Sequence, residues 1–240
     1  MEYLYPPVIP AVTVAGSDRT LAVHRIYCVG KNYADHAREM GGDPGREPPC
    51  FFSKPADAIV HNQAEIPFPG RTGNLHYEVE LVVAIGRKGA NLNRDSARQM
   101  ILGYGVGIDL TRRDLQQEAK DSGRPWDVAK GFDNSAPLSA IHPVAETGFL
   151  ESAEISLTVN GERRQHGDIA DMTWDIPEII AELSTYFTLQ PGDLIFTGTP
   201  AGVGSLQPGD QVVGHVAGVD TVSIRLVQGD LRSSGVPTSG

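Results

Sequence analysis

The sequence is short of cysteine and of long apolar runs, and each absence excludes a class of protein. Only Cys28 and Cys50 occur among the 240 residues, which excludes a framework of disulfides and is typical of a reducing compartment. The longest aliphatic run, residues 81–85, is too short to span a bilayer. Residues 1–7 have neither the basic region nor the apolar core of a signal peptide. We therefore expect a soluble, cytoplasmic protein.

Positive charge is scarce as well. The chain has 20 lysines and arginines against 30 aspartates and glutamates, which gives a formal net charge of −10 at pH 7. An acidic excess of this size repels phosphate groups, so we expect no binding to nucleic acids or to anionic membranes. Hydrophobic residues at 40% and charged residues at 21% are enough for a packed core and argue against disorder.

Glycine and proline, by contrast, are abundant. The 27 glycines and 17 prolines indicate many turns and a strand-rich fold. A β-rich domain often reaches about 200–250 residues as one unit. We predict a single α+β domain, dominated by β structure, over residues 21–228. The Pro-rich residues 1–20 are expected to wrap the surface of this domain, and residues 229–240 to form a flexible tail.

Apolar periodicity predicts the strands. The clearest strand covers residues 75–85, which are dense in Val, Leu and Ile. A second is predicted over residues 103–108, where the glycines imply close backbone approach or bulging. Asn160-Gly161 is the preferred tight turn of a hairpin, and it follows an alternating apolar stretch that begins at Ile155. Further strands are predicted over residues 21–29, 210–216 and 221–227.

Capping residues predict the helices. Residues 32–41 are expected to form a short helix, with Asn32 as its N-cap and Gly41 as its stop. Thr111 is expected to cap the helix that follows the 103–108 strand. Asp175 opens another helix with a capping box and a proline in its first turn. One more short helix is predicted over residues 93–102.

Two glutamates on the strand predicted over residues 75–85 suggest a metal site. Glu78 and Glu80 are two residues apart, so both project from one face of that strand. Two ionised carboxylates among apolar neighbours repel each other and lose their hydration, and a divalent cation is the simplest compensation. Asp109, at the end of the next strand, can supply a third ligand. Oxygen ligands alone indicate Mg²⁺ or Mn²⁺, and less readily Ca²⁺. A solvated strand face fits the same residues equally well.

A histidine and a lysine are candidates for catalysis. His36 and Glu39 stand three apart on the predicted 32–41 helix, so they share one face. A carboxylate beside an imidazole raises its basicity, which a general base for water requires. On its own, such a pair is more often a surface ion pair. Lys130 lies among aromatic residues and could stabilise a developing anion, or its stem could simply cover those rings.

Two glycine-rich segments are candidates for contacts with substrate. Residues 197–204 lack the Gly-Lys-Ser/Thr ending of a phosphate loop, but their backbone N–H groups and the Thr199 hydroxyl could hold a substrate carboxylate. Residues 42–49, rich in glycine, proline and charge, are expected to be mobile. We expect them, with the preceding helix, to become ordered over the site when substrate binds.

Five motifs, in this order, are those of a known family. They are Gly30-Lys31-Asn32-Tyr33-Ala34-Asp35-His36, Phe52-Ser53-Lys54-Pro55, His76-Tyr77-Glu78-Val79-Glu80-Leu81, Asp109-Leu110-Thr111-Arg112-Arg113-Asp114 and Thr197-Gly198-Thr199-Pro200. Over residues 20–228 the sequence resembles the fumarylacetoacetate hydrolase family, and within it the bacterial fumarylpyruvate hydrolases.

The resemblance implies a fold, an assembly and a set of site residues. The fold is a mixed β-sandwich roll and the assembly is a homodimer. A divalent metal is expected on Glu78, Glu80 and Asp109. The catalytic positions are expected to be His36, Glu39 and Lys130, and the substrate-binding positions Lys54, Arg113, Gln116 and Thr199.

The activity that the resemblance implies is hydrolysis of a carbon–carbon bond in a 2,4-dioxo acid, with fumarylpyruvate split into fumarate and pyruvate. His36, supported by Glu39, would deprotonate a water that attacks C4, with the metal as Lewis acid. Decarboxylation of oxaloacetate-like acids or keto–enol isomerisation can use the same residues, and the sequence separates these reactions poorly. A non-catalytic dimeric binding protein with a structural metal is a remote alternative, because it would not need the His-x-x-Glu pair.

Overall fold

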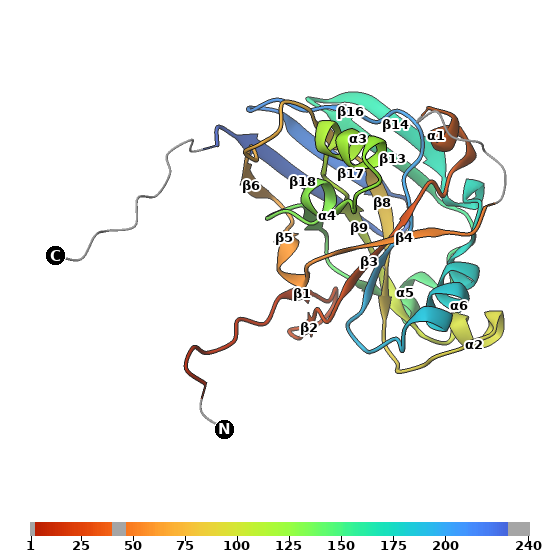
Figure 1. Cartoon of the computed structure of the whole chain (residues 1–240). Helices are drawn as coiled ribbons and strands as arrows, with labels where there is room; N and C mark the ends of the chain where they lie inside the picture. Colours follow the sequence, from red (N-terminus) through yellow and green to blue (C-terminus); the bar gives the residue numbers. More distant parts are fainter. Residues whose placement is uncertain (1–2, 40–46, 230–240) are drawn as a thin grey trace.

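Strands account for most of the regular structure in the computed structural model, which describes residues 3–39 and 47–229 (Figure 1). An eight-stranded sheet has the order β4-β3-β15-β8-β9-β11-β5, with β12 paired to β9. Its strands are β3 (Ile26–Gly30), β4 (Cys50–Lys54), β5 (Ile59–His61), β8 (Val79–Ile85), β9 (Ile101–Ile108), β11 (Ala136–Leu138), β12 (His142–Pro143) and β15 (Leu194–Phe196).

Smaller sheets complete the fold. A five-stranded sheet has the order β14-β13-β17-β18-β6, and β10-β7-β16 and β1-β2 form two more. Most pairs are antiparallel, but β11–β5, β15–β3 and β18–β6 run parallel, so the predicted mixed, β-dominated fold is confirmed. The strands are β1 (Ala11–Thr13), β2 (Thr20–Ala22), β6 (Ala64–Pro67), β7 (Leu75–Tyr77), β10 (Thr111–Arg112), β13 (Glu154–Val159), β14 (Glu162–Asp168), β16 (Gly204–Ser205), β17 (Gln211–Val216) and β18 (Asp220–Val227).

The helices are short. They are α1 (Ala34–Glu39), α2 (Arg94–Arg98), α3 (Arg113–Asp121), α4 (Asp127–Lys130), α5 (Val144–Thr147) and α6 (Ile176–Tyr186), with 3₁₀ turns at Ala56–Ala58 and Ile169–Asp171. Helix α2 packs against α6 at one end of the molecule (Figure 1). Among the residues that the structure describes, no helix combines the length and the apolar character needed to cross a membrane.

Both faces of the eight-stranded sheet are buried. On β8, Leu81 and Val83 belong to a core shared with the five-stranded sheet. Val82 points the other way and belongs to a second core with Phe196, around which the sheet curls. Because side chains alternate along a strand, Glu80 shares the face of Val82. The alternation therefore directs a carboxylate into the concave side of the curled sheet.

The strand predicted over residues 75–85 is in fact two strands, and the break falls at Glu78. The neighbouring strand is interrupted at the same level, since β9 ends at Ile108 and β10 begins at Thr111. The two segments stay hydrogen-bonded across the break, because the backbone N–H of Asp109 donates to the carbonyl of Glu78 at 2.8 Å. The strand pair thus passes from the eight-stranded to the three-stranded sheet. The carboxylates of Glu78 and Asp109 lie at this transition.

Two predicted caps are wrong, because each side chain has distant partners instead. The Asn32 Oδ1 accepts from the Trp174 N–H at 2.8 Å, and its amide nitrogen donates to the carbonyls of Trp174 and Thr197, so Asn32 does not cap α1, which begins at Ala34. Thr111 belongs to β10, and its hydroxyl donates to the carbonyl of Asp109. The strand predicted over 21–29 and the helix predicted over 93–102 are each shorter than expected, since β3 begins at Ile26 and α2 ends at Arg98.

Other local predictions are confirmed. Asp175 caps α6, and its carboxylate and that of Glu178 form the expected capping box. Asn160 and Gly161 have φ angles of 53° and 80°, which the tight turn between β13 and β14 requires. The predicted stop at Gly41, most of the 42–49 loop and most of the 229–240 tail lie outside the described residues.

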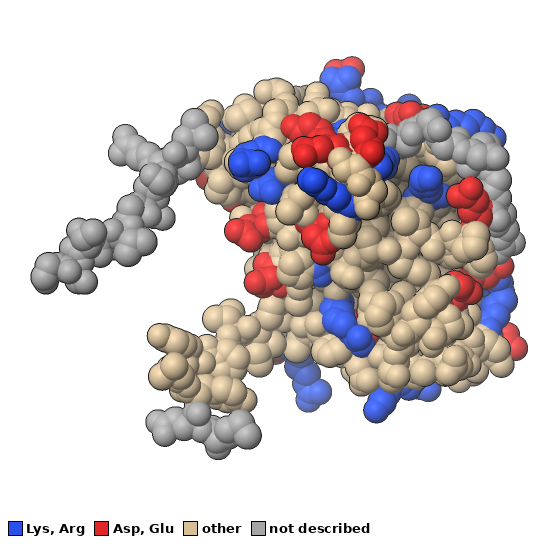
Figure 2. Space-filling view, in the orientation of Figure 1, with Lys and Arg blue, Asp and Glu red and all other residues tan. Residues whose placement is uncertain are grey.

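The N-terminal segment packs on the domain as expected only in its later part. There β1 pairs with β2, Val12 is buried in the second core, and the Ile141 N–H donates to the Thr13 carbonyl at 2.8 Å. Residues 3–9 extend away from the body as an arm without charged groups (Figures 1 and 2). On this arm Leu4 is 90% and Val8 92% exposed, so the apolar side chains find no partner surface in their own domain.

Gly107 allows a close approach inside the curled sheet, and we expect Gly107→Ala to be destabilising. A Cβ at this position would lie 2.4 Å from the Phe196 ring and 2.7 Å from the Val82 methyl. Overpacking of this kind costs about 1–3 kcal/mol, which chemical denaturation would measure. Gly70→Ala is the matched control, because nothing lies within 4 Å of a Cβ there. Equal unfolding midpoints for the two variants would contradict the prediction.

Candidate active site

Three buried carboxylates meet where the strand pair changes sheets. One oxygen from each of Glu78, Glu80 and Asp109 lies within 4.8 Å of the others. The residues are 4%, 2% and 0% exposed, respectively, which excludes the solvated strand face that the sequence left open. Their acidic oxygens face one cavity, so the cluster could hold a metal ion.

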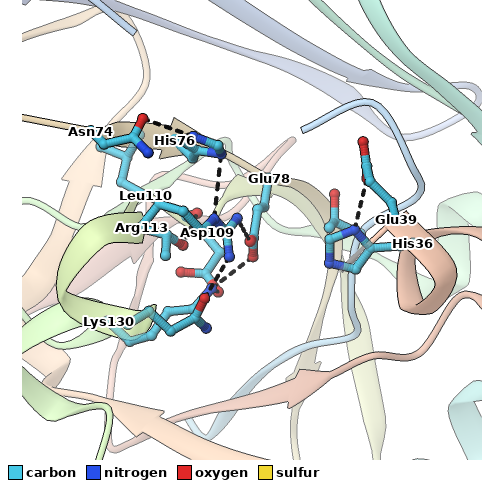
Figure 3. A network of polar contacts seen from close by, with 12 residues as sticks. His36, Glu39, Asn74, His76, Glu78, Asp109, Leu110, Arg113 and Lys130 are labelled. Atoms are coloured by element: carbon cyan, nitrogen blue, oxygen red, sulfur yellow. Dashed lines mark hydrogen bonds and ion pairs between the residues drawn. The ribbon is translucent and has the colours of Figure 1, made fainter. Parts of the chain in front are cut away.

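Basic side chains compensate most of this negative charge (Figure 3). The Lys130 ammonium lies 2.7 Å from Glu78 Oε2 and 2.6 Å from Asp109 Oδ2. The Lys54 ammonium lies 2.8 Å from Asp109 Oδ1, and the Arg113 guanidinium is bonded to Glu78. The expectation that a metal is the simplest compensation is therefore corrected, because the protein supplies three cations of its own. Nor does Lys130 merely cover aromatic rings, since its charged end is buried between carboxylates.

Glu80 differs from its two neighbours. Within residues 3–39 and 47–229 no ion pair joins it to a basic side chain, and its bonded partner is the Gly198 N–H at 2.7 Å. Burial, together with the charges of Asp109 and Glu78, raises the pKa of Glu80 well above its usual value. Burial has the same tendency at Glu78, but the charges of Lys130 and Arg113 outweigh it and lower the pKa of that carboxyl.

The donor set fits a hard divalent cation. Asp109 Oδ1 is buried and receives no hydrogen bond of good geometry, although the Lys54 ammonium is near it. Glu80 has no cation of its own, so it too offers oxygen lone pairs to an incoming ion. Carboxylate oxygens without nitrogen or sulfur ligands favour Mg²⁺, Mn²⁺ or Ca²⁺. Glu78, Glu80 and Asp109 are therefore the residues that would bind it.

His36 lines the same cavity and is paired with Glu39. His36 is 6% exposed, and its Nδ1 lies 3.2 Å from Glu39 Oε2 (Figure 3). The ionised Glu39 carboxylate accepts from Nδ1–H, which leaves the Nε2 lone pair free to accept a proton. Glu39 in turn accepts from the Gly202 N–H at 3.1 Å. The buried imidazole sets this pair apart from the exposed surface pair that the sequence also allowed.

In the glycine-rich loop over residues 197–204, two backbone N–H groups bond carboxylates of the protein itself rather than being free for a substrate. The N–H of Gly198 is bonded to Glu80 and that of Gly202 to Glu39, so these two donors are already used. Both glycines have φ near +100°, a conformation that other residues avoid. Thr199 remains available, because its hydroxyl accepts from Gln165 Nε2 and keeps its own hydrogen to donate into the cavity.

Two positioning residues were not foreseen from the sequence. Gln165, on β14, bonds the Val79 N–H, the Thr199 hydroxyl and the Pro200 carbonyl. His76 accepts from Arg113 Nε through Nδ1 and bonds Asn74 through Nε2. Burial and the nearby Arg113 charge lower the pKa of His76 to about 4, so it is neutral near pH 7. His76 lies in a recognised motif, but no local pattern marks Gln165.

The four predicted substrate contacts occupy different environments. Arg113, Gln116 and Thr199 line the cavity, and Arg113 Nη1 donates to Gln116 Oε1 at 2.6 Å. Lys54 lies behind Asp109 with no exposed side-chain surface, and its ammonium is bonded to the carbonyls of Leu110 and Lys130. Among the described residues the cavity lining also includes Lys31, Phe52, Lys120 and Trp126, none of which was predicted as a site residue.

Fold and site together define a curled mixed-sheet protein with a buried carboxylate cluster that could hold a metal ion and an adjacent His–Glu pair. The family model described as fumarylacetoacetate (FAA) hydrolase C-terminal matches residues 25–227. The chain therefore belongs to the fumarylacetoacetate hydrolase family, and the resemblance seen in its motifs is confirmed.

Relatives within this family carry different activities. The chain is 44% identical over 182 residues to a fumarylpyruvate hydrolase from a Ralstonia species, covering 76% of this chain and 94% of the relative. It is 47% identical over 191 residues to oxaloacetate tautomerase YcgM from Escherichia coli K12, covering 79% and 87%. A crystal structure of fumarylpyruvate hydrolase from Pseudomonas aeruginosa in complex with Mn²⁺ and pyruvate has a TM-score of 0.93 at 48% identity, covering 95% and 100%. The chain is thus an enzyme rather than a non-catalytic binding protein.

The unequal compensation of Glu78 and Glu80 leads to a prediction about metal binding. Glu80→Gln should abolish the rise in melting temperature that Mn²⁺ gives, yet leave the metal-free protein at least as stable, because it removes a buried carboxyl group that has no basic partner among the described residues. Glu78→Gln should destabilise the metal-free protein by about 3–5 kcal/mol, because it takes the carboxylate partner from the buried Arg113 and leaves Lys130 with Asp109 alone. Thermal unfolding with EDTA or Mn²⁺ tests both variants.

Glu118→Gln, at an exposed position on α3, serves as the control and should keep the full effect of Mn²⁺. Retention of the Mn²⁺ effect in Glu80→Gln would remove this residue from the metal site.

Proposed function

We propose that this chain hydrolyses the C3–C4 bond of a 2,4-dioxo acid, with fumarylpyruvate as substrate and fumarate and pyruvate as products. The observation that carries the proposal is the convergence of a carboxylate cluster and the buried base His36 on one cavity. Hydrolysis of this bond needs an activated water and a means of accepting charge on the leaving carbon, and the cavity offers groups for both. Similarity to two fumarylpyruvate hydrolases supports the choice of substrate.

In this proposal Glu78, Glu80 and Asp109 hold a divalent metal, with Mg²⁺ or Mn²⁺ favoured over Ca²⁺. Once bound, such an ion supplies Lewis-acid polarisation of substrate oxygens. The complex of the P. aeruginosa relative with Mn²⁺ and pyruvate supports both the ion and the kind of product. Lys130, Arg113 and backbone bonds keep the ligand carboxylates in place before the ion arrives.

His36 acts as the general base. Its Nε2 takes a proton from water, and the oxygen adds to the C4 carbonyl. The C3–C4 bond then breaks, its electron pair stays on C3, and the proton held on Nε2 is available to that carbon. Glu39 orients the imidazole and stabilises its charged form, and the Gly202 N–H fixes Glu39.

The remaining cavity residues bind and position the substrate. The Lys130 ammonium, buried beside the cluster, lowers the energy of negative charge that develops on the substrate. Arg113, Gln116 and Thr199 offer donors to its oxygens. Lys54 we assign as a positioning residue, because its ammonium contacts Asp109 and two backbone carbonyls.

A second candidate is tautomerisation or decarboxylation of an oxaloacetate-like acid. The 47% identity to an oxaloacetate tautomerase favours it, and so does the site, since both reactions pass through an enolate. They differ from hydrolysis in needing no water at C4. A base such as His36 can serve either chemistry. The carboxylate cluster and the His36–Glu39 pair therefore do not distinguish hydrolysis from tautomerisation or decarboxylation.

A substrate panel tests which reaction the chain performs. We expect the Mn²⁺-loaded enzyme to turn over fumarylpyruvate faster than maleylpyruvate, simple acylpyruvates or oxaloacetate. Each fumarylpyruvate consumed should give one pyruvate, measured with lactate dehydrogenase, and one fumarate, measured by chromatography. Rapid enolisation of oxaloacetate without cleavage of any 2,4-dioxo acid would establish the second candidate instead.

The role of His36 gives a quantitative prediction. His36→Ala should lower kcat for fumarylpyruvate by roughly 10²- to 10⁴-fold, the usual contribution of a positioned general base. Mn²⁺ binding should persist in this variant, because His36 is not one of the cluster's three residues. His61→Ala, at an exposed position on β5, is the control. Near-normal hydrolysis by His36→Ala would return the His36–Glu39 pair to a structural role.

The proposal extends to a homodimer in the cytoplasm. The arm over residues 3–9 leaves large apolar side chains in solvent, and the association of two copies would cover such surface. The small number of cysteines, one of them buried, is consistent with a reducing compartment.

A further inference from the structure

Two lysines at the cavity have no part in the proposed chemistry. Lys31 follows β3, and Lys120 lies in the last turn of α3, yet both line the cavity that contains the carboxylate cluster. In the part of the chain that the structure describes, neither ammonium has a carboxylate partner. Lys120 Nζ instead lies 5.5 Å from the centre of the Trp126 ring. Two free cations at one cavity are a recognition feature for an anion.

The spacing along α3 places Lys120 at a distance from the cluster. Arg113, Gln116 and Lys120 occupy positions i, i+3 and i+7, so they follow one face of the helix, and all three line the cavity. Arg113 lies at the end of this row nearest the carboxylate cluster, because it is bonded to Glu78. Seven residues rise about 10 Å along a helix axis. This is comparable with the length of an extended chain of seven carbons.

The wall between the two ends suits a flat, unsaturated chain. Phe52 and Trp126 line it, with their ring centres 5.7 Å apart. Lys31 reaches the cavity from a backbone with φ of +59°, a conformation that favours glycine over lysine. Burial is the main cause of the lowered pKa of Lys120, and the positive charges of Arg113 and Lys31 lower it further.

We propose that Lys31 and Lys120 form a subsite for a second carboxylate, so that the enzyme selects long 2-oxo dicarboxylates over their monocarboxylate counterparts. The inference rests on the proposed function in one respect, namely that the 2-oxo acid end of the ligand binds at the carboxylate cluster. Fumarylpyruvate, with seven carbons and a carboxylate at each end, spans both sites. Oxaloacetate, with four carbons, is too short to reach from the cluster to the lysines.

Binding of a matched pair of acids tests the subsite without any reaction. 2-Oxoheptanedioate and 2-oxoheptanoate have the same chain length and lack the C4 oxo group, so neither can be hydrolysed. Calorimetry on the Mn²⁺-loaded full chain should show the diacid binding about tenfold more tightly, the usual gain from a charge-assisted contact. In the double variant K31M/K120M this preference should vanish while the affinity for the monoacid stays unchanged. Lys120→Arg should retain it.

Lys88→Met, which removes an exposed lysine after β8, is the control and should keep the full preference. Equal affinity of the wild type for the two acids, or an intact preference in K31M/K120M, would overturn the proposal. The result is separable from the proposed function. A wild type that prefers the diacid but fails to hydrolyse fumarylpyruvate would refute the hydrolase and leave the subsite standing.

Discussion

The constraint on which the rest of the structure depends is the burial of three carboxylates at the change between two sheets. Carboxylates buried so close together are unstable without compensation. Their basic partners come from separate segments, with Lys54 on β4, Arg113 on α3 and Lys130 on α4. The charges thereby fix where β4, α3 and α4 lie relative to β8 and β9. Of the three carboxylates, Glu80 is the one without an ion pair to a basic side chain of the described residues, so its oxygens could take part in holding a metal ion.

A single loop, over residues 197–204, connects this cluster to the His36–Glu39 pair. Gly198 bonds Glu80 and Gly202 bonds Glu39, while Asn32 anchors the start of the loop through the Thr197 carbonyl. The loop therefore contacts both the carboxylate cluster and the His36–Glu39 pair, and helps to set the distance between them. The chain is similar both to a fumarylpyruvate hydrolase and to an oxaloacetate tautomerase, two relatives whose names give different substrates. What separates their substrates is then expected in the outer wall of the cavity.

The sequence by itself determined whatever depends on neighbours along the chain. The alternation that begins at Ile155, the Asn160-Gly161 turn and the capping box of Asp175 follow local rules, and all appear as predicted. The spacing of Glu78 and Glu80 likewise put both carboxylates on one side of the chain, because side chains alternate along extended backbone. The ordered motifs were sufficient to identify the family.

Tertiary structure alone decided what depends on distant partners. Asparagine is a residue type that often caps helices, but the Asn32 amide donates to the Thr197 carbonyl, 165 residues away. Lys54 was expected to meet the substrate, but it is buried behind Asp109. Gln165 lies on a hairpin strand without any local signal, yet it joins β8 to the Thr199 loop. A polar side chain inside a fold must bond to whatever lies opposite it, and that partner is set by the packing of the sheets rather than by adjacent residues.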